Sequence, residues 1–125
     1  MKKLFLPACL ALLLAFAAAP LSAHHSWPVS YDRLVTVKGT VTEVQWANPH
    51  PMFILNVQSA DGSTEKWHVG GPAIIRMEAN GWSKTTVKPG DVITGIGYQY
   101  ADGQKIVRLE RVLLADGKEL RIYAR

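Results

Sequence analysis

Four histidines are the residues of this chain best suited to bind a metal ion. His24 and His25 are adjacent near the N-terminus, His50 lies in the segment Trp-Ala-Asn-Pro-His-Pro at residues 46–51, and His68 lies in an alternating run. Nitrogen ligands in a tetragonal arrangement favour Cu(II) among the first-row metals. The histidines therefore predict a copper site formed by His24, His25 and His50, with His68 as a further candidate.

The first 23 residues have the layout of a secretory signal peptide. Residues 1–3 are basic, residues 4–19 are apolar apart from Pro7, and the segment ends in Leu-Ser-Ala. The apolar run is shorter than the roughly 20 residues that a spanning helix needs. We therefore expect export to the periplasm or the medium, cleavage after Ala23, and no membrane span in the mature protein.

The position of the cleavage site decides what the first histidine can do. If the cut follows Ala23, His24 becomes the N-terminal residue, and its α-amino group and ring nitrogen can chelate one Cu(II) ion together. A cut one residue earlier would place His25 third in the chain, where it also binds Cu(II) in a square plane. Pro20 would then stand three residues before the cut, which favours the first alternative. Adjacent histidines are also common as simple polar residues, and His50 could instead hydrogen-bond within its own loop.

Composition and charge exclude several other classes of protein. The only cysteine is Cys9, inside the predicted signal peptide, so we expect neither a disulfide nor a thiolate metal site. The net charge of +4 falls to about +2 when Lys2 and Lys3 are removed. The chain contains no basic run, so nucleic acid is not an expected partner.

Alternating apolar residues predict a protein made mostly of strands. In the first strand the alternation slips by one residue after Val41, which indicates a bulge. Three Ala-Asp-Gly tripeptides indicate three tight turns, and Asn80-Gly81 is a typical end for a helix. The predicted elements are strands at 35–46, 52–57, 65–69, 92–100 and 106–114, a short helix opened by Pro72, and a closing strand at 120–123.

This order of elements predicts an all-β domain with one short helix, a small OB-like barrel of five or six strands. A small β-sandwich or an open barrel is the alternative. We divide the chain into a signal peptide at 1–23, an irregular N-terminal arm at 24–34, and one OB-like domain at 35–125. In such a barrel the loop between the first two strands, here residues 47–51, commonly belongs to the ligand face.

The aromatic residues support a second hypothesis, in which the barrel binds a ligand other than a metal. OB-type barrels stack ligands on exposed rings, and a sugar or peptide is the expected ligand of an exported protein. Trp27, Trp46, Asn48 and His50 are the predicted ligand-binding residues, with Trp46 as the ligand-facing indole. Trp67 and Trp82 also suit packing in the core. The rings that could form such a stacking surface are Trp27, Trp46, Trp67, Trp82, Tyr31, Tyr98 and Tyr100.

The sequence contains no constellation that predicts catalysis. Ser26 and His25 are too close in the chain to act as nucleophile and base without a third group that orients them. Asp61, Asp102 and Asp116 belong to the Ala-Asp-Gly turns. We therefore predict that the protein is not an enzyme.

Several short motifs together resemble a family of small exported bacterial proteins of unknown function. The motifs are His-His-Ser at 24–26, Tyr-Asp at 31–32, Gly-Thr-Val at 39–41, Trp-Ala-Asn-Pro-His at 46–50, Gly-Trp at 81–82 and Lys-Pro-Gly-Asp at 88–91. The resemblance implies an exported OB-like protein and no particular activity. An acidic residue often follows the third-strand tryptophan in that family, whereas this chain has His68 or Val69 there.

These observations predict a monomeric or weakly associating binding protein whose functional face combines residues 24–27 with the loop 46–51. In the leading hypothesis it binds copper. In the alternative it is a ligand- or partner-binding module, accessory to an exported oxidoreductase.

Overall fold

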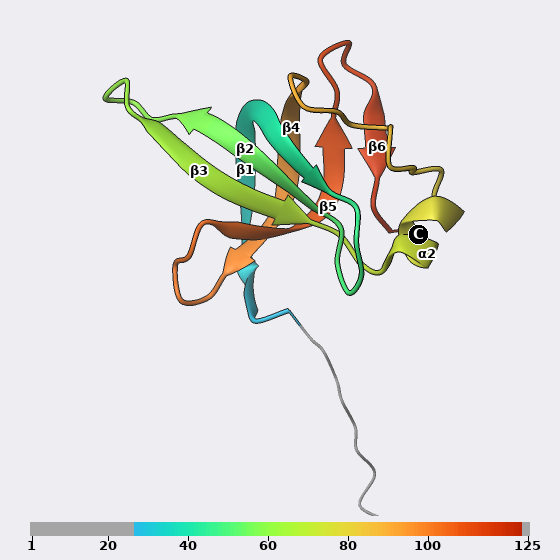
Figure 1. The fold of residues 1–125 in the computed structure, drawn as a ribbon. Helices are drawn as coiled ribbons and strands as arrows, with labels where there is room; N and C mark the ends of the chain where they lie inside the picture. The colour runs from blue at the N-terminus through green and yellow to red at the C-terminus, as the bar shows by residue number, and fades with distance from the viewer. Residues whose placement is uncertain (1–26, 124–125) are drawn as a thin grey trace, which may run out of the picture.

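A computed structural model describes residues 27–123 of the protein. The predicted signal peptide, its cleavage site, His24 and His25 lie outside the described residues. The elements, in chain order, are β1 (Val29–Gln45), β2 (Met52–Gln58), β3 (Thr64–Gly70), α2 (Ile74–Ala79), β4 (Val92–Tyr100), β5 (Ile106–Leu113) and β6 (Glu119–Arg121) (Figure 1).

The strands form one sheet that closes on itself. Its order is β3-β2-β1-β4-β5-β6, and β3 also pairs with β5 in parallel, through His68–Gly70 and Ile106–Arg108. The neighbouring strands pair antiparallel. The closed ring is therefore β1-β2-β3-β5-β4, with β6 added at the edge of β5. This arrangement confirms the predicted OB-like barrel with one short helix.

The long first strand bends at the predicted bulge. Its register against β2 shifts between Val41 and Glu43, where the alternation of apolar residues slips. The bend lets β1 pair with β4 through its first half and with β2 through its second half. β1 therefore connects β2 to β4 within the closed sheet.

The start of β1 corrects the predicted extent of the arm. The strand begins at Val29, which pairs with Tyr100. Residues 29–34, which we assigned to the arm at 24–34, therefore belong to β1. Residues 31–34 are exposed, and the register shifts again between Val29 and Leu34. The apolar alternation that indicates a strand is therefore missing here, although the backbone still pairs.

Side chains from the inner faces of the strands form the core, and the segment after β3 closes it. The buried cluster includes Val41, Phe53, Leu55, Val69, Val107, Leu109 and Val112, together with Met77 from α2. Trp82 is 3% exposed, its ring lies 5.9 Å from that of Phe53, and its Nε1–H donates to the Arg121 carbonyl oxygen at 2.8 Å. The core role considered for Trp82 is confirmed.

Helix α2 is shorter than the sequence indicates. Pro72 does not open it: the helix begins at Ile74, after Ala73 in an extended conformation with ψ of 151°. The Gly71 N–H donates to the Pro51 carbonyl oxygen at 3.1 Å, which holds this stretch against the β1–β2 loop instead. The predicted end is confirmed, because Asn80 caps the helix and Gly81 has φ of +86°.

Within residues 27–123 there is no helix whose length and apolar character would allow it to cross a membrane.

Candidate functional site

The loop between β1 and β2 is held in place by two hydrogen bonds to the segment that leads into α2. Asn48 Oδ1 accepts from the Ile74 N–H at 3.1 Å, and the Pro51 carbonyl oxygen accepts from the Gly71 N–H. The Asn48–Pro49 peptide bond is cis, and Pro51 is buried. Because these two hydrogen bonds hold the loop, it presents His50 from a fixed backbone, and Asn48 positions the loop on the helix.

Asn48→Ala is expected to destabilise the protein by about 1 kcal/mol, because the first amide of α2 loses its side-chain acceptor. Chemical denaturation followed by circular dichroism measures the change. Asn48→Asp is the matched control, since it keeps an oxygen in place and adds a negative charge at a helix N-terminus. A loss from Asn48→Asp as large as that from Asn48→Ala would contradict the assigned role.

Trp27 packs directly on the His50 imidazole. The ring centroids are 4.5 Å apart with an interplanar angle of 44°, and the Tyr100 ring meets Trp27 edge-on at 6.1 Å. The backbone around Trp27 is also held, because the Pro28 carbonyl oxygen accepts from the Ala101 N–H at 2.9 Å. Trp27 of the predicted arm therefore lies on the predicted loop, and the sequence-predicted residues Trp27 and His50 are in contact.

One nitrogen of the His50 imidazole has no hydrogen-bond partner within the described part of the chain. Its Nδ1 is enclosed and has no hydrogen-bond partner there. Buried polar atoms are usually paired. One ring nitrogen of His50 nevertheless stays unpaired among residues 27–123.

His68 lies elsewhere on the barrel. It pairs with Ile54 of β2 and Ile106 of β5, and its neighbours Trp67 and Val69 lie on the inner face of β3. His50, by contrast, precedes the first residue of β2. Residues 27–123 hold no group of three or more His, Cys, Asp or Glu side chains arranged for a metal ion.

The aromatic residues do not form one platform. Trp46 and Trp67 are partly buried against the core, and Trp82 is fully inside it. Tyr31 and Tyr98 form a separate pair on the surface, 5.2 Å apart, with the Arg108 guanidinium 5.8 Å from the Tyr31 ring centroid. The sequence did not single out Tyr100 as the ring behind Trp27, because that contact depends on how β1 and β4 pair.

The turn aspartates take the roles that the Ala-Asp-Gly motif predicts. Asp61 accepts from the Ser63 hydroxyl and backbone N–H, and these bonds hold the pKa of Asp61 below its ordinary value. Asp102 accepts from Gln104 in the same way, which lowers its pKa as well. The glycine that follows each aspartate, and Gly117 after Asp116, has a positive φ of 84–86°. These carboxylates stabilise turns.

Solved structures resemble this chain in fold alone. The crystal structure of the ZRD-deleted mutant of TiaS in complex with agmatine matches 72% of this chain at 16% identity, with a TM-score of 0.52. A crystal structure of TiaS in complex with a tRNA and ATP matches 74% at 13% identity, with a TM-score of 0.49. The matched region is 26% and 20% of those two chains, so this protein corresponds to a small part of each.

The comparison of sequences places the chain in a family but does not indicate an activity. No curated protein matches it. The model of one family matches residues 11–108, which span the described β1 to β4 and the start of β5. With most of its length matched, the chain belongs to DUF6152, a family of unknown function.

Proposed function

We propose that this protein is an exported copper-binding protein that holds Cu(II) between its N-terminal histidines and His50. The contact between Trp27 and His50 is the observation that carries the proposal. It brings the chain that immediately follows the two histidines onto the loop that presents the third.

Chain length limits how far the N-terminal histidines can lie from Trp27. A fully extended chain spans at most about 3.6 Å per residue, so the Cα atom of His25 lies within about 7 Å of that of Trp27, and that of His24 within about 11 Å. The Trp27 ring is itself 4.5 Å from the His50 ring. Residues 24 and 25 are therefore close enough along the chain for an imidazole side chain to approach the His50 ring.

The chemistry of the donors fits Cu(II). Cleavage after Ala23 would supply an α-amino nitrogen and a ring nitrogen from His24, and His50 supplies an imidazole whose Nδ1 has no other partner among residues 27–123. Such nitrogen-rich sets favour Cu(II) over the other divalent first-row ions. Trp27 covers one side of the His50 ring, which restricts its motion and its exposure to water. Protons compete with the metal for imidazole, so binding weakens below about pH 6.

The test uses protein exported through its own signal and processed by the cell. Its intact mass identifies the first residue, and a Cu(II) titration followed by electron paramagnetic resonance counts the bound ions and their nitrogen ligands. We expect one stoichiometric species, with His50→Ala lowering the affinity tenfold or more, by about 1.4 kcal/mol or more. His68→Ala is the matched control and is expected to leave the spectrum and affinity unchanged.

A different result would overturn the proposal. Copper bound only loosely, with a spectrum indifferent to His50→Ala, would show that the terminal histidines bind metal without the barrel. Trp27, Trp46 and Asn48 would then remain as candidates for a metal-independent binding face, as in a module accessory to an exported oxidoreductase. A mature mass that places the first residue well before or after His24 would also remove the proposed amino-terminal ligand.

A further inference from the structure

A cleft with a volume of about 380 Å³ opens between the first half of β1 and the β2–β3 hairpin. It exists because β1 pairs with β2 only from Thr40 onward, so the preceding part of β1 is paired with β4 alone and diverges from the hairpin. The residues that matter in its lining are Val35, Val37, Val57, Ser59, Glu65 and Trp67. We name this feature the hairpin cleft; His50 does not belong to it.

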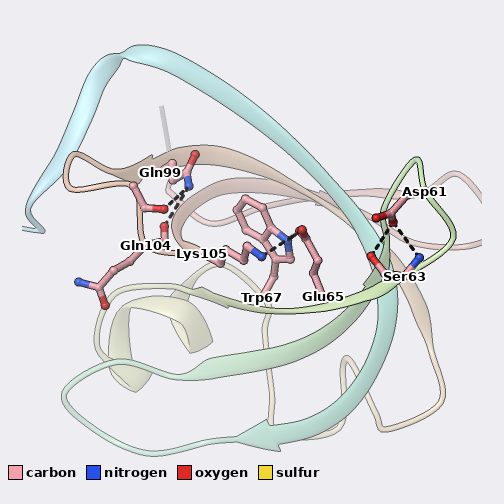
Figure 2. Close-up of polar contacts among 8 residues, drawn as sticks. Asp61, Ser63, Glu65, Trp67, Gln99, Gln104 and Lys105 are labelled. Carbon is pink, nitrogen blue, oxygen red and sulfur yellow. Dashed lines mark hydrogen bonds and ion pairs between the residues drawn. The ribbon is translucent and has the colours of Figure 1, made fainter.

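The hairpin cleft contains a carboxylate fixed by two donors. Glu65 accepts from Lys105 Nζ at 3.0 Å and from the Trp67 Nε1–H at 3.2 Å (Figure 2). Hydrogen bonds from Lys105 and then Trp67 hold the pKa of Glu65 below its ordinary value. The carboxylate is therefore ionised and acts purely as an acceptor, so a ligand at this position must bring hydroxyl or N–H donors.

A second polar group of the hairpin cleft lacks a partner. Ser59 Oγ is enclosed and makes no hydrogen bond of ordinary geometry with the described residues, although it lies close enough to Glu65 to help lower its pKa. The Ser59 hydroxyl therefore supports the ionised form of Glu65, and the Glu65 carboxylate is the acceptor that the cleft offers to a ligand.

The charges around the hairpin cleft favour a neutral ligand. Lys105 already neutralises Glu65, and Lys38 also lines the cleft, so an ammonium ion would meet two competing cations. An anion could pair with Lys38, but it would compete with Glu65 for Lys105 and would bring no donor for the Glu65 oxygens. A neutral molecule with several hydroxyl groups can instead donate to Glu65 and accept from Lys38 or from the Gln58 amide, which also lines the cleft.

We propose that the hairpin cleft binds a neutral sugar of one or two rings. Trp67 and the three valines offer an apolar surface for the C–H face of a pyranose, while Glu65 and Gln58 pair with its hydroxyl groups. The volume lies within the roughly 300–1,000 Å³ of typical small-ligand sites, near the lower end. This site is independent of the proposed copper site, and neither requires the other.

The test is a titration of the copper-free mature protein with cellobiose, chitobiose and maltose, followed by ¹H–¹⁵N spectra. We expect at least one disaccharide to shift the Trp67 indole N–H resonance, assigned with Trp67→Phe, and the Ser59 amide, with a Kd of about 1 mM. Glu65→Gln is expected to raise that Kd tenfold or more while the rest of the spectrum stays the same. Glu43→Gln, an exposed glutamate on β1 outside the cleft, is the matched control and leaves the Kd unchanged.

Two outcomes would overturn the sugar assignment. In the first, none of the disaccharides shifts cleft resonances, or the shifts are indifferent to Glu65→Gln. In the second, n-butylammonium shifts the same resonances while the sugars do not, which would show that the cleft exchanges Lys105 for a cationic amine. Because the variants leave all four histidines intact, failure here is distinguishable from failure of the copper proposal.

Discussion

Gly97→Ala is expected to destabilise the barrel by about 3 kcal/mol or more, a large part of the total stability of a domain of this size. A Cβ atom at Gly97 would lie 2.8 Å from the Arg108 carbonyl carbon and 2.9 Å from the Leu109 Cα, and closer still to the Arg108 carbonyl oxygen. These are backbone atoms of the paired strand β5, so the clash can be relieved only by separating β4 from β5. Urea denaturation of the mature protein measures the loss.

Gly95→Ala is the matched control for that prediction. Gly95 lies two residues earlier in the same strand, but its closest contact for an added Cβ is Leu109 Cδ2 at 2.8 Å, the end of a side chain that can rotate. We expect a cost of about 1 kcal/mol. Equal losses for the two variants would contradict the argument that backbone contact makes Gly97 irreplaceable.

Trp82→Ala is expected to cost about 3–5 kcal/mol, the range measured for removing a large buried aromatic side chain. Trp82 is 3% exposed and packs on Phe53, and it links the segment after α2 to the last strand through its bond to the Arg121 carbonyl oxygen. Its removal leaves both a cavity and an unpaired carbonyl group. The midpoint of urea unfolding is the measurement.

Trp82→Phe separates the contribution of ring packing from that of the hydrogen bond to Arg121. Phenylalanine keeps most of the ring contact with Phe53 but cannot donate to Arg121, so we expect a smaller loss of about 1–3 kcal/mol. A loss below about 1 kcal/mol for Trp82→Ala would mean that the segment after α2 is not part of the cooperative core. The two variants together measure how strongly that segment closes the barrel.

Local patterns predicted the elements well because their physical causes are local. The slip in alternation after Val41 marks the bulge, since each side chain of a strand must face either the core or solvent. The positive φ of Gly81 and of the glycines after the turn aspartates follows from turn and cap chemistry within a few residues. The order of strands and helix, read together, was sufficient to predict the OB-like barrel.

The predicted starts of β1 and α2 were wrong, because backbone hydrogen bonds to distant segments set them and not the side-chain pattern. The start of β1 at Val29 is set by backbone bonds to β4, while residues 31–34 remain exposed and leave no apolar pattern. The helix begins at Ile74 instead of Pro72 because the preceding residues bond to the β1–β2 loop. In both places a partner distant in sequence overrides the local preference.

The sequence by itself determined the composition of the candidate site: a loop that holds His50 between two prolines and two histidines close to Trp27. Only the tertiary structure decided that Trp27 packs on His50 with Tyr100 behind it, and that His68 lies apart from them. It also created the hairpin cleft, where Glu65 and Trp67 of β3 face β1. These contacts join segments that are far apart in the chain, so they depend on strand pairing and barrel closure and leave no mark in local sequence.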